Sequence, residues 1–183
     1  MVSRAGIVAA IGNFDGVHRG HRRLIADTIA FARANDAAAG AVVFDPHPRR
    51  YFRPDDPPFL LTTAKQRDAL LKEAGAEHVF SLAFDKQLAA LAPEAFVVEI
   101  LKKRLKLAGV VTGTEFRFGK GRSGDAEGLK ALCEAAGMKA LLVTPSAEAA
   151  GGEKISSSEI RAMIEAGDMR AAAALLGRPW AVE

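Results

Sequence analysis

Sixteen residues near the N-terminus decide the fold: Gly6-Ile-Val-Ala-Ala-Ile-Gly-Asn-Phe-Asp-Gly-Val-His-Arg-Gly-His21. They begin with a short apolar run that ends in Gly-Asn, which is typical of a buried strand entering a loop. Residues 20–35 then show a helical pattern, with Ile25 and Ile29 on one face. The stretch predicts a strand, a glycine-rich loop and a helix, the arrangement in which α/β folds bind phosphate groups.

The alternation of strand and helix patterns continues along the chain. Apolar runs predict further strands over residues 41–44, 78–84, 109–113 and 139–144. Capping residues, periodic apolar positions and closing glycines predict helices over residues 62–75, 93–106, 125–137, 157–166 and 169–176. We therefore expect one α/β domain over residues 1–183, with a mainly parallel sheet and helices on both of its faces. Ligands of such sheets bind beyond the carboxyl ends of the strands.

Composition and charge limit the classes of function. The 183 residues carry a net charge of +3, which suits small anionic ligands, and no basic run interleaved with aromatics indicates a nucleic-acid partner. Cys133 is the only cysteine, so an intramolecular disulfide and a cysteine-based zinc site are excluded. No apolar run reaches the ~18 residues of a membrane span, and the N-terminus is too short for a signal peptide. We therefore expect a cytoplasmic protein without a membrane partner. Nothing in the sequence indicates the oligomeric state.

The loop after the first strand holds the strongest candidates for a ligand site. Gly12 and Gly16 allow tight turns, and Gly20 allows a ligand to approach the start of the helix. His18 and His21 lie three residues apart, so both imidazoles can point into one crevice beside the partial positive charge of the helix N-terminus. We expect this cluster of positive potential to bind a triphosphate.

Two other interpretations of the histidines are open. The side chains could cap the helix or pack in the core. They could also bind a metal, but only His47 and His78 occur elsewhere and no third ligand is spaced nearby, so we expect no metal site built from protein ligands. The glycines and the strand–loop–helix setting favour phosphate binding.

The same loop resembles a known family. His18-x-Gly-His21 after a strand is similar to the His-x-Gly-His signature of the nucleotidylyltransferase superfamily. The longer string from Gly12 to His21 resembles the adenylyltransferase module of bacterial bifunctional riboflavin kinase/FAD synthetases. The resemblance implies a Rossmann-like nucleotidylyltransferase fold and transfer of AMP from ATP to FMN, with Mg²⁺ accompanying ATP and with FAD and pyrophosphate as products. It implies catalysis by His18 and His21 and ATP binding by Gly12, Asn13, Phe14 and Gly20.

The second loop contains Phe44-Asp-Pro-His-Pro48. Its two prolines predict a stiff extended loop without a helix, continuing to Pro58. Rigid prolines beside Phe44, Phe52 and Phe59 would form an apolar wall for a flat heterocycle, although each phenylalanine could equally fill the core. The string also resembles the family's border of the flavin site, which implies FMN binding by Phe44, Pro46, His47 and Pro48.

Residues 113–125 follow the fourth predicted strand and contain Gly119-x-Gly121-x-x-Gly124, a literal match to the dinucleotide-binding fingerprint. The match is weak, because that fingerprint normally follows the first strand and no acidic residue clearly ends the next strand. The segment also resembles the family's Gly-x-Asp-Phe-Arg-Phe-Gly element, with Glu115 where Asp or Asn is usual. The resemblance implies FMN binding by Glu115 and Arg122, while Lys120 and Arg122 could equally form a solvated basic turn.

Near the C-terminus, the string Lys154-Ile-Ser-Ser-Ser-Glu-Ile-Arg161 predicts a second anion site. Ser156 and Glu159 form a capping-box pattern, which by itself indicates only a helix start. A helix cap uses only one hydroxyl, and this string has three in a row. Together with Lys154 and Arg161, these hydroxyls can hold phosphate oxygens at the helix N-terminus. The string resembles the superfamily's Ile-Ser-Ser-Thr-x-x-Arg element, which implies a catalytic role for Arg161 and ATP binding by Lys154, Ser157 and Ser158.

The expected chemistry needs little acid–base catalysis. The phosphate of FMN is already ionised when it attacks the α-phosphorus of ATP, so catalysis should come from holding two anions in line and neutralising charge. Other open functions are a His-x-Gly-His transferase using CTP or another acceptor, a catalytically silent nucleotide-binding module, and a dinucleotide-dependent oxidoreductase. The riboflavin kinase module that usually follows Arg178-Pro179 in this family is missing from the sequence, so we expect no phosphorylation of riboflavin.

Overall fold

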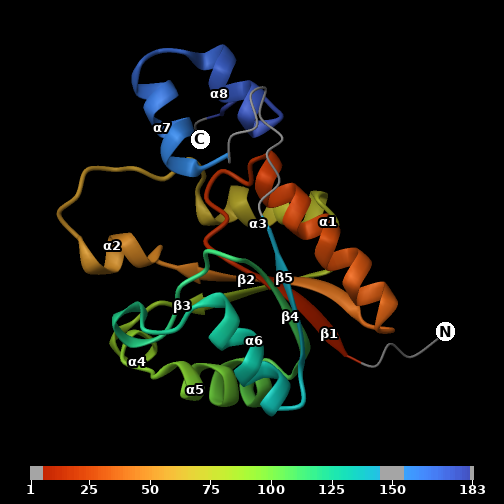
Figure 1. The fold of residues 1–183 in the computed structure, drawn as a ribbon. Coiled ribbons are helices and arrows are strands. Elements are labelled where there is room, and N and C mark those ends of the chain that lie inside the picture. Colours follow the sequence, from red (N-terminus) through yellow and green to blue (C-terminus); the bar gives the residue numbers. More distant parts are fainter. Residues whose placement is uncertain (1–5, 145–154, 182–183) are drawn as a thin grey trace.

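The structure, a computed structural model, describes residues 6–144 and 155–181. Within these ranges the chain forms one sheet with strand order β3-β2-β1-β4-β5, and all neighbouring strands are parallel (Figure 1). The strands are β1 (Ile7–Ile11), β2 (Ala38–Asp45), β3 (His78–Ala83), β4 (Leu107–Gly113) and β5 (Lys139–Val143). The predicted parallel sheet is confirmed, and each strand lies where an apolar run predicted it.

Helices alternate with these strands. They are α1 (Arg19–Ala34), α2 (Pro48–Phe52), α3 (Ala64–Glu73), α4 (Lys86–Ala89), α5 (Pro93–Ala95), a π-helix (Phe96–Arg104), a 3₁₀ turn (Lys120–Arg122), α6 (Ala126–Ala135), α7 (Ser157–Glu165) and α8 (Met169–Leu176). In Figure 1, α7 and α8 form a pair above the sheet, at the end of the molecule away from α5 and α6. No helix in the described parts of the chain has the length and apolarity that a membrane crossing requires.

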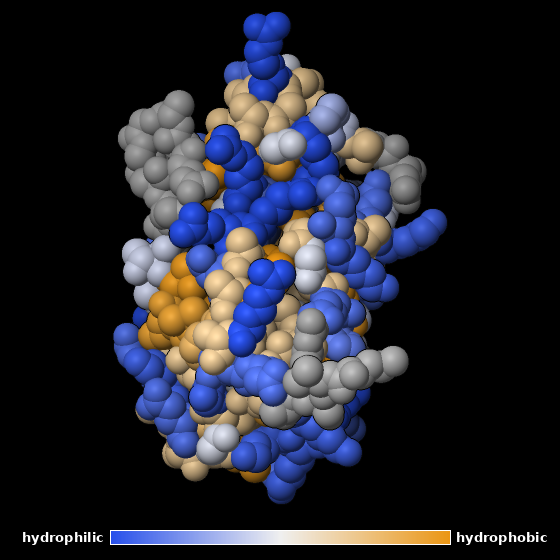
Figure 2. Space-filling model, turned by 90° about the vertical axis from the view of Figure 1, so that its right-hand side faces the viewer, coloured by the Kyte–Doolittle hydropathy of each residue, from blue (hydrophilic) through white to orange (hydrophobic). Residues whose placement is uncertain are grey.

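The two faces of the sheet carry different helices because successive residues of a strand point in opposite directions. Val8 and Ala10 of β1 are buried in clusters that include apolar residues of α1 and α3. Ala9 and Ile11 are buried in the opposite cluster, which includes residues of the π-helix and α6. The expectation of helices on both faces is therefore confirmed. The side of the molecule that carries α1 shows a hydrophilic band between the α7–α8 pair and the body below (Figure 2).

Local signals placed several helix ends correctly. Thr63 caps α3 and forms a reciprocal capping box with Gln66, and Asp125 caps α6. Gly177 ends α8 in the left-handed conformation that favours glycine. The predicted helices that begin at residues 157 and 169 start at those positions as α7 and α8.

The prediction of an extended loop from Asp45 to Pro58 is wrong. Pro48 is the first residue of α2, a position where its missing N–H and fixed φ angle are tolerated. The imidazole Nδ1 of His47 accepts a hydrogen bond from the N–H of Arg49 at 3.1 Å and so caps the helix. The two prolines therefore restrict where the helix begins but do not forbid it.

The helix predicted over residues 93–106 also differs in kind. After one α-turn from Pro93, the chain continues as a π-helix, which closes with a 2.9 Å hydrogen bond from the N–H of Leu105 to the carbonyl of Ile100. Its buried residues, Phe96, Val97 and Leu101, still face the core, as the apolar pattern requires.

Candidate active site

Two adjoining cavities lie at the carboxyl ends of the strands. The smaller, about 340 Å³, is bordered by the ends of β1, β4 and β5 and by the start of α7. The larger, about 860 Å³, is bordered by α2, the start of the π-helix and the 3₁₀ turn. Both cavities are lined by Gly12, Glu115 and Phe116. A ligand in one cavity would therefore meet a ligand in the other beside the loop after β1.

The paired histidines line the smaller cavity, and one of them also caps a helix. The Nδ1 atom of His18 accepts a hydrogen bond from the N–H of His21 at 3.3 Å, which makes His18 the N-cap of α1. The two rings stack with centroids 3.6 Å apart. Gly20 permits this packing, since a Cβ atom there would lie 3.2 Å from the His18 ring. The capping interpretation is therefore confirmed for His18, and the same side chain lines the smaller cavity.

Burial keeps His21 uncharged in the protein alone. Desolvation, and secondarily the neighbouring His18, hold the pKa of His21 well below its usual value of 6.5. Its Nδ1 atom is buried without a hydrogen-bond partner. Positive potential at this loop therefore comes from the N-terminus of α1 rather than from an imidazolium at His21. His21 instead presents a neutral ring with unused hydrogen-bonding capacity at the wall of the cavity.

The serine-rich segment brings the start of α7 to the same loop. Ser156 caps α7 by accepting a hydrogen bond from the N–H of Glu159 at 3.1 Å. Ser157 lines the smaller cavity, and its hydroxyl donates to the carbonyl of Asp15 at 2.9 Å. Ser158 is exposed and accepts a 3.4 Å hydrogen bond from Arg161. Lys154 lies outside the described residues.

Arg161 forms an ion pair that sequence reasoning did not anticipate. Its Nη2 atom lies 2.7 Å from Oδ2 of Asp15, whose side chain is almost fully buried. Its Nε atom donates to the carbonyl of Phe59 at 2.7 Å. Arg161 is not among the residues that line either of the two cavities. The only sequence signal for Asp15 was its position as the single carboxylate in the glycine-rich loop that carries His18 and His21.

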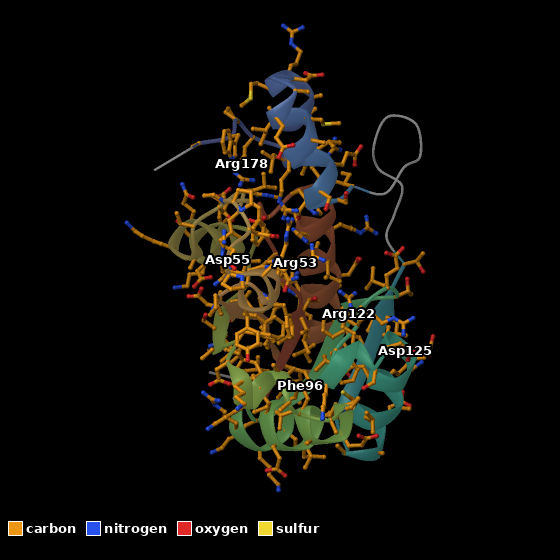
Figure 3. All side chains as sticks on the ribbon, turned by 90° about the vertical axis from the view of Figure 1, so that its left-hand side faces the viewer. Arg53, Asp55, Phe96, Arg122, Asp125 and Arg178 are labelled. Atoms are coloured by element: carbon orange, nitrogen blue, oxygen red, sulfur yellow. The ribbon has the colours of Figure 1, made fainter. Side chains whose placement is uncertain are left out.

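The larger cavity combines aromatic and basic side chains. Of the residues that we expect to bind FMN, the following line it: Phe44, His47, Pro48, Glu115 and Arg122. Pro46 does not. Figure 3 shows that the labelled Arg53, Arg122 and Phe96 come from three different segments on this side of the molecule. The wall also contains residues that were not selected from the sequence: Arg49, Arg53, Phe84, Phe96, Arg117 and Phe118. These residues lie far apart in sequence, so only the fold brings them together.

Burial also lowers the pKa of His47. Desolvation is the main cause, and the positive charges of Arg161, Arg49 and Arg67 act in the same direction, while Asp15 opposes them. The ring of His47 meets that of Phe59 edge-on, with centroids 5.2 Å apart. His47 therefore lines the larger cavity and also packs on Phe59, whose ring centroid lies 5.3 Å from the guanidinium carbon of Arg161.

Packing explains the match to the dinucleotide fingerprint. A Cβ atom at Gly119 would lie 2.8 Å from the ring of Pro93, and one at Gly124 would lie 2.6 Å from the ring of Phe118. The segment follows β4, and α6 begins only after Asp125. Gly119 and Gly124 thus permit a close approach of neighbouring side chains, whereas a Cβ atom at Gly121 would meet no atom within 4 Å. Within the described ranges, no three His, Cys, Asp or Glu side chains gather where they could hold a metal ion.

Comparisons with known proteins identify the family of the chain. Residues 2–159 match the family model described as FAD synthetase. The chain is 35% identical over 179 residues to a bifunctional riboflavin kinase/FMN adenylyltransferase from Escherichia coli K12, covering 97% of this chain and 56% of the relative. It is 34% identical to an FAD synthetase from Listeria monocytogenes, covering 97% of this chain and 71% of the relative. The chain thus spans little more than half the length of several curated relatives that it matches.

A solved structure shows the same fold. It is titled as a macrolide-efflux protein from Streptococcus pneumoniae and superimposes with a TM-score of 0.83 at 29% identity. The superposition covers 97% of this chain and 66% of that chain. The agreement extends over nearly the whole chain, so it includes the sheet and the elements that border both cavities.

Proposed function

The chain belongs to the FAD synthetase family, and from this premise we propose that it transfers AMP from ATP to the phosphate of FMN, forming FAD and pyrophosphate. One observation carries the proposal: two cavities of different character share the wall formed by Gly12, Glu115 and Phe116. The transfer needs two anionic substrates that meet at one phosphorus atom. Adjoining cavities on either side of a phosphate-binding loop suit that requirement.

The smaller cavity takes ATP in this proposal. The N-termini of α1 and α7 both reach it, and their free N–H groups favour a triphosphate. His18 and His21 serve the α-phosphate, and Ser157 serves the β- and γ-phosphates. We retain Lys154, Ser158 and Arg161 as further ATP ligands, together with Gly12, Asn13, Phe14 and Gly20.

The larger cavity takes the flavin. Phe44 and Pro48 offer an apolar wall, Arg122 offers a polar contact, and Glu115 offers another on the wall shared with the smaller cavity. Its five basic residues give a positive lining for the phosphate of FMN: Arg49, Arg53, Arg117, Lys120 and Arg122. Transfer would require the FMN phosphate to reach the wall shared by the two cavities at Gly12, where the ATP phosphates would lie.

The transfer then proceeds as a single displacement. An oxygen of the FMN phosphate attacks the α-phosphorus of ATP, and the bond from that phosphorus to the bridging oxygen of the β-phosphate breaks. Pyrophosphate leaves with the electron pair. The neutral imidazole of His21 can donate a hydrogen bond to a phosphate oxygen without the cost of bringing a second charge into a buried site. Mg²⁺ bound to ATP would neutralise phosphate charge and be held mainly by phosphate oxygens, because the described residues provide no cluster of protein ligands.

Direct product analysis tests the proposal. The protein is mixed with Mg²⁺, ATP and FMN, and FAD is measured by chromatography together with pyrophosphate release. Parallel reactions replace ATP with CTP, or FMN with other phosphate acceptors. Formation of FAD and pyrophosphate in equal amounts supports the proposal. Product formation only with another nucleotide or acceptor would replace it with a different transferase, and binding of both substrates without turnover would indicate a silent module.

A further inference from the structure

A short segment between α2 and α3 joins the two halves of the site. Residues 59–62, Phe-Leu-Leu-Thr, line neither of the two cavities. The N–H groups of Leu61 and Thr62 donate to Oδ1 of Asp15 at 2.8 and 3.2 Å. The hydroxyl of Thr62 accepts from the N–H of Gly16 at 3.1 Å. The 59–62 segment therefore holds the loop after β1 in place through hydrogen bonds, without lining either cavity.

The same segment holds the start of α7 and the C-terminal segment. The carbonyl of Phe59 accepts from Nε of Arg161 at 2.7 Å. The carbonyl of Leu61 accepts from Nε1 of Trp180 at 2.9 Å. The side chain of Leu61 is buried in a cluster with Ile155 and with apolar residues of α7 and α8. Movement of the 59–62 segment would thus displace α7 as well as the loop after β1.

The ring of Phe59 connects this assembly to the flavin side. The guanidinium carbon of Arg49 lies 4.5 Å from the ring centroid, and those of Arg50 and Arg161 each lie 5.3 Å from it. The imidazole of His47 packs edge-on against the same ring at 5.2 Å. Arg49, Arg50 and His47 belong to α2 and its cap, whereas Arg161 belongs to α7. One aromatic ring therefore contacts cations from both sides of the site.

We propose that Phe59 is a positioning residue for AMP transfer, because its ring and carbonyl fix α2, beside the larger cavity, relative to α7, beside the smaller one. The inference rests on the proposed function, in which the two cavities hold the two substrates. In-line transfer requires the reacting atoms to approach closely, and a misplacement of about 1 Å can lower the rate ~100-fold. Because Phe59 lines neither cavity, its substitution should disturb the relative placement of the substrates more than the binding of each one.

Steady-state kinetics of the full chain test this inference. Phe59→Ala should lower kcat by about 10- to 100-fold, while KM for ATP and for FMN each changes by less than about threefold. Phe59→Tyr keeps the aromatic face and should restore most of kcat. Leu60→Ala is the matched control, because the neighbouring Leu60 side chain is 46% exposed, and its kcat should equal that of the wild type.

Thermal unfolding and substrate binding separate positioning from simple loss of fold. The folded fraction is measured for each variant, and kcat is expressed per folded molecule. A Phe59→Ala variant with kcat per folded molecule within about twofold of the wild type would overturn the inference. So would a variant whose rate loss appears entirely as raised KM, since that result would indicate lost binding of one substrate.

A binding measurement keeps the inference testable even if the proposed function fails. FMN fluorescence is titrated with protein in the presence and absence of a non-hydrolysable ATP analogue. In the wild type, the analogue should change the dissociation constant of FMN by a measurable factor. In Phe59→Ala, the ratio of the dissociation constants with and without the analogue should fall to about one, while the affinity for FMN alone stays the same. A wild type that makes no FAD but shows this coupling would reject the proposed function alone. Coupling that survives unchanged in Phe59→Ala would reject the positioning role.

Discussion

Asp15→Asn tests whether the buried ion pair organises the site. The side chain of Asp15 is 3% exposed and that of Arg161 16%, with Nη2 of Arg161 2.7 Å from Oδ2 of Asp15. Asparagine keeps one oxygen that can accept the hydrogen bonds from the N–H groups of Leu61 and Thr62, but it removes the negative charge. Arg161 would then be a largely buried cation without its counter-charge.

The expected loss of stability follows from this burial. Breaking a buried pair by removing one partner costs about 3–5 kcal/mol. We take the lower end, about 3 kcal/mol, because Arg161 keeps some contact with water and its hydrogen bond to the carbonyl of Phe59. For a chain of 183 residues this corresponds to a fall in Tm of roughly 6–12 °C.

Urea unfolding followed by circular dichroism measures the free energy of unfolding directly. The control is Lys103→Gln, which removes an ion pair of the same 2.7 Å length between Lys103 and Glu99, whose side chains are 63% and 53% exposed. That pair should contribute less than about 1 kcal/mol. If Asp15→Asn lowers the free energy of unfolding no more than Lys103→Gln does, the reasoning is refuted, because the buried pair would then stabilise the protein no more than an exposed one.

Three further predictions follow from single residues. His21→Ala should lower turnover by roughly 100-fold or more, the scale of losing one preorganised hydrogen-bonding group, and wild-type rates of FAD formation would contradict this. The pKa of His21 in the folded protein lies below its ordinary value of 6.5. As the pH falls below 6.5, the unfolded chain therefore takes up a proton that the folded chain does not. The free energy of unfolding should decrease as a result. Unfolding measured between about pH 5 and 7.5 should show a smaller decrease in His21→Gln than in the wild type, and equal slopes would exclude His21 as the cause. Gly119→Ala should lower the free energy of unfolding in urea more than Gly121→Ala does. Both glycines have positive φ, but only at Gly119 does the added Cβ atom meet the ring of Pro93, at 2.8 Å. Equal losses of unfolding free energy would rule out that clash.

Sequence reasoning succeeded where the signal is local. The strand from Ile7, the loop with His18 and His21, and the starts of α7 and α8 were all predicted from residues within a few positions of one another. Caps, glycine stops and apolar periodicity act over one or two helical turns, so they can be identified without knowing the fold. The same locality explains one failure: Pro48 was interpreted as a barrier, although it begins α2.

The loop after β1 shows most clearly what could not be predicted from the sequence. Its motif predicted a phosphate site but not the charge state of that site. Burial of His21, and secondarily the electrostatic effect of the neighbouring His18, lower a pKa that the sequence alone gives no reason to change. The walls of the larger cavity likewise combine Phe44, Phe96 and Arg122 from separate elements. Each of these properties depends on neighbours distant in sequence.

The sequence by itself determined the parallel α/β fold, most helix ends and the loop that carries the paired histidines. Only the tertiary structure decided that Asp15 pairs with Arg161, 146 positions away, and that Phe59 lies between α2 and α7. Hydrogen bonds of helices and turns join residues a few positions apart, so their pattern can be recognised in the sequence. Buried ion pairs and cation–π contacts depend on which distant segments the packed core brings within a few ångströms of each other.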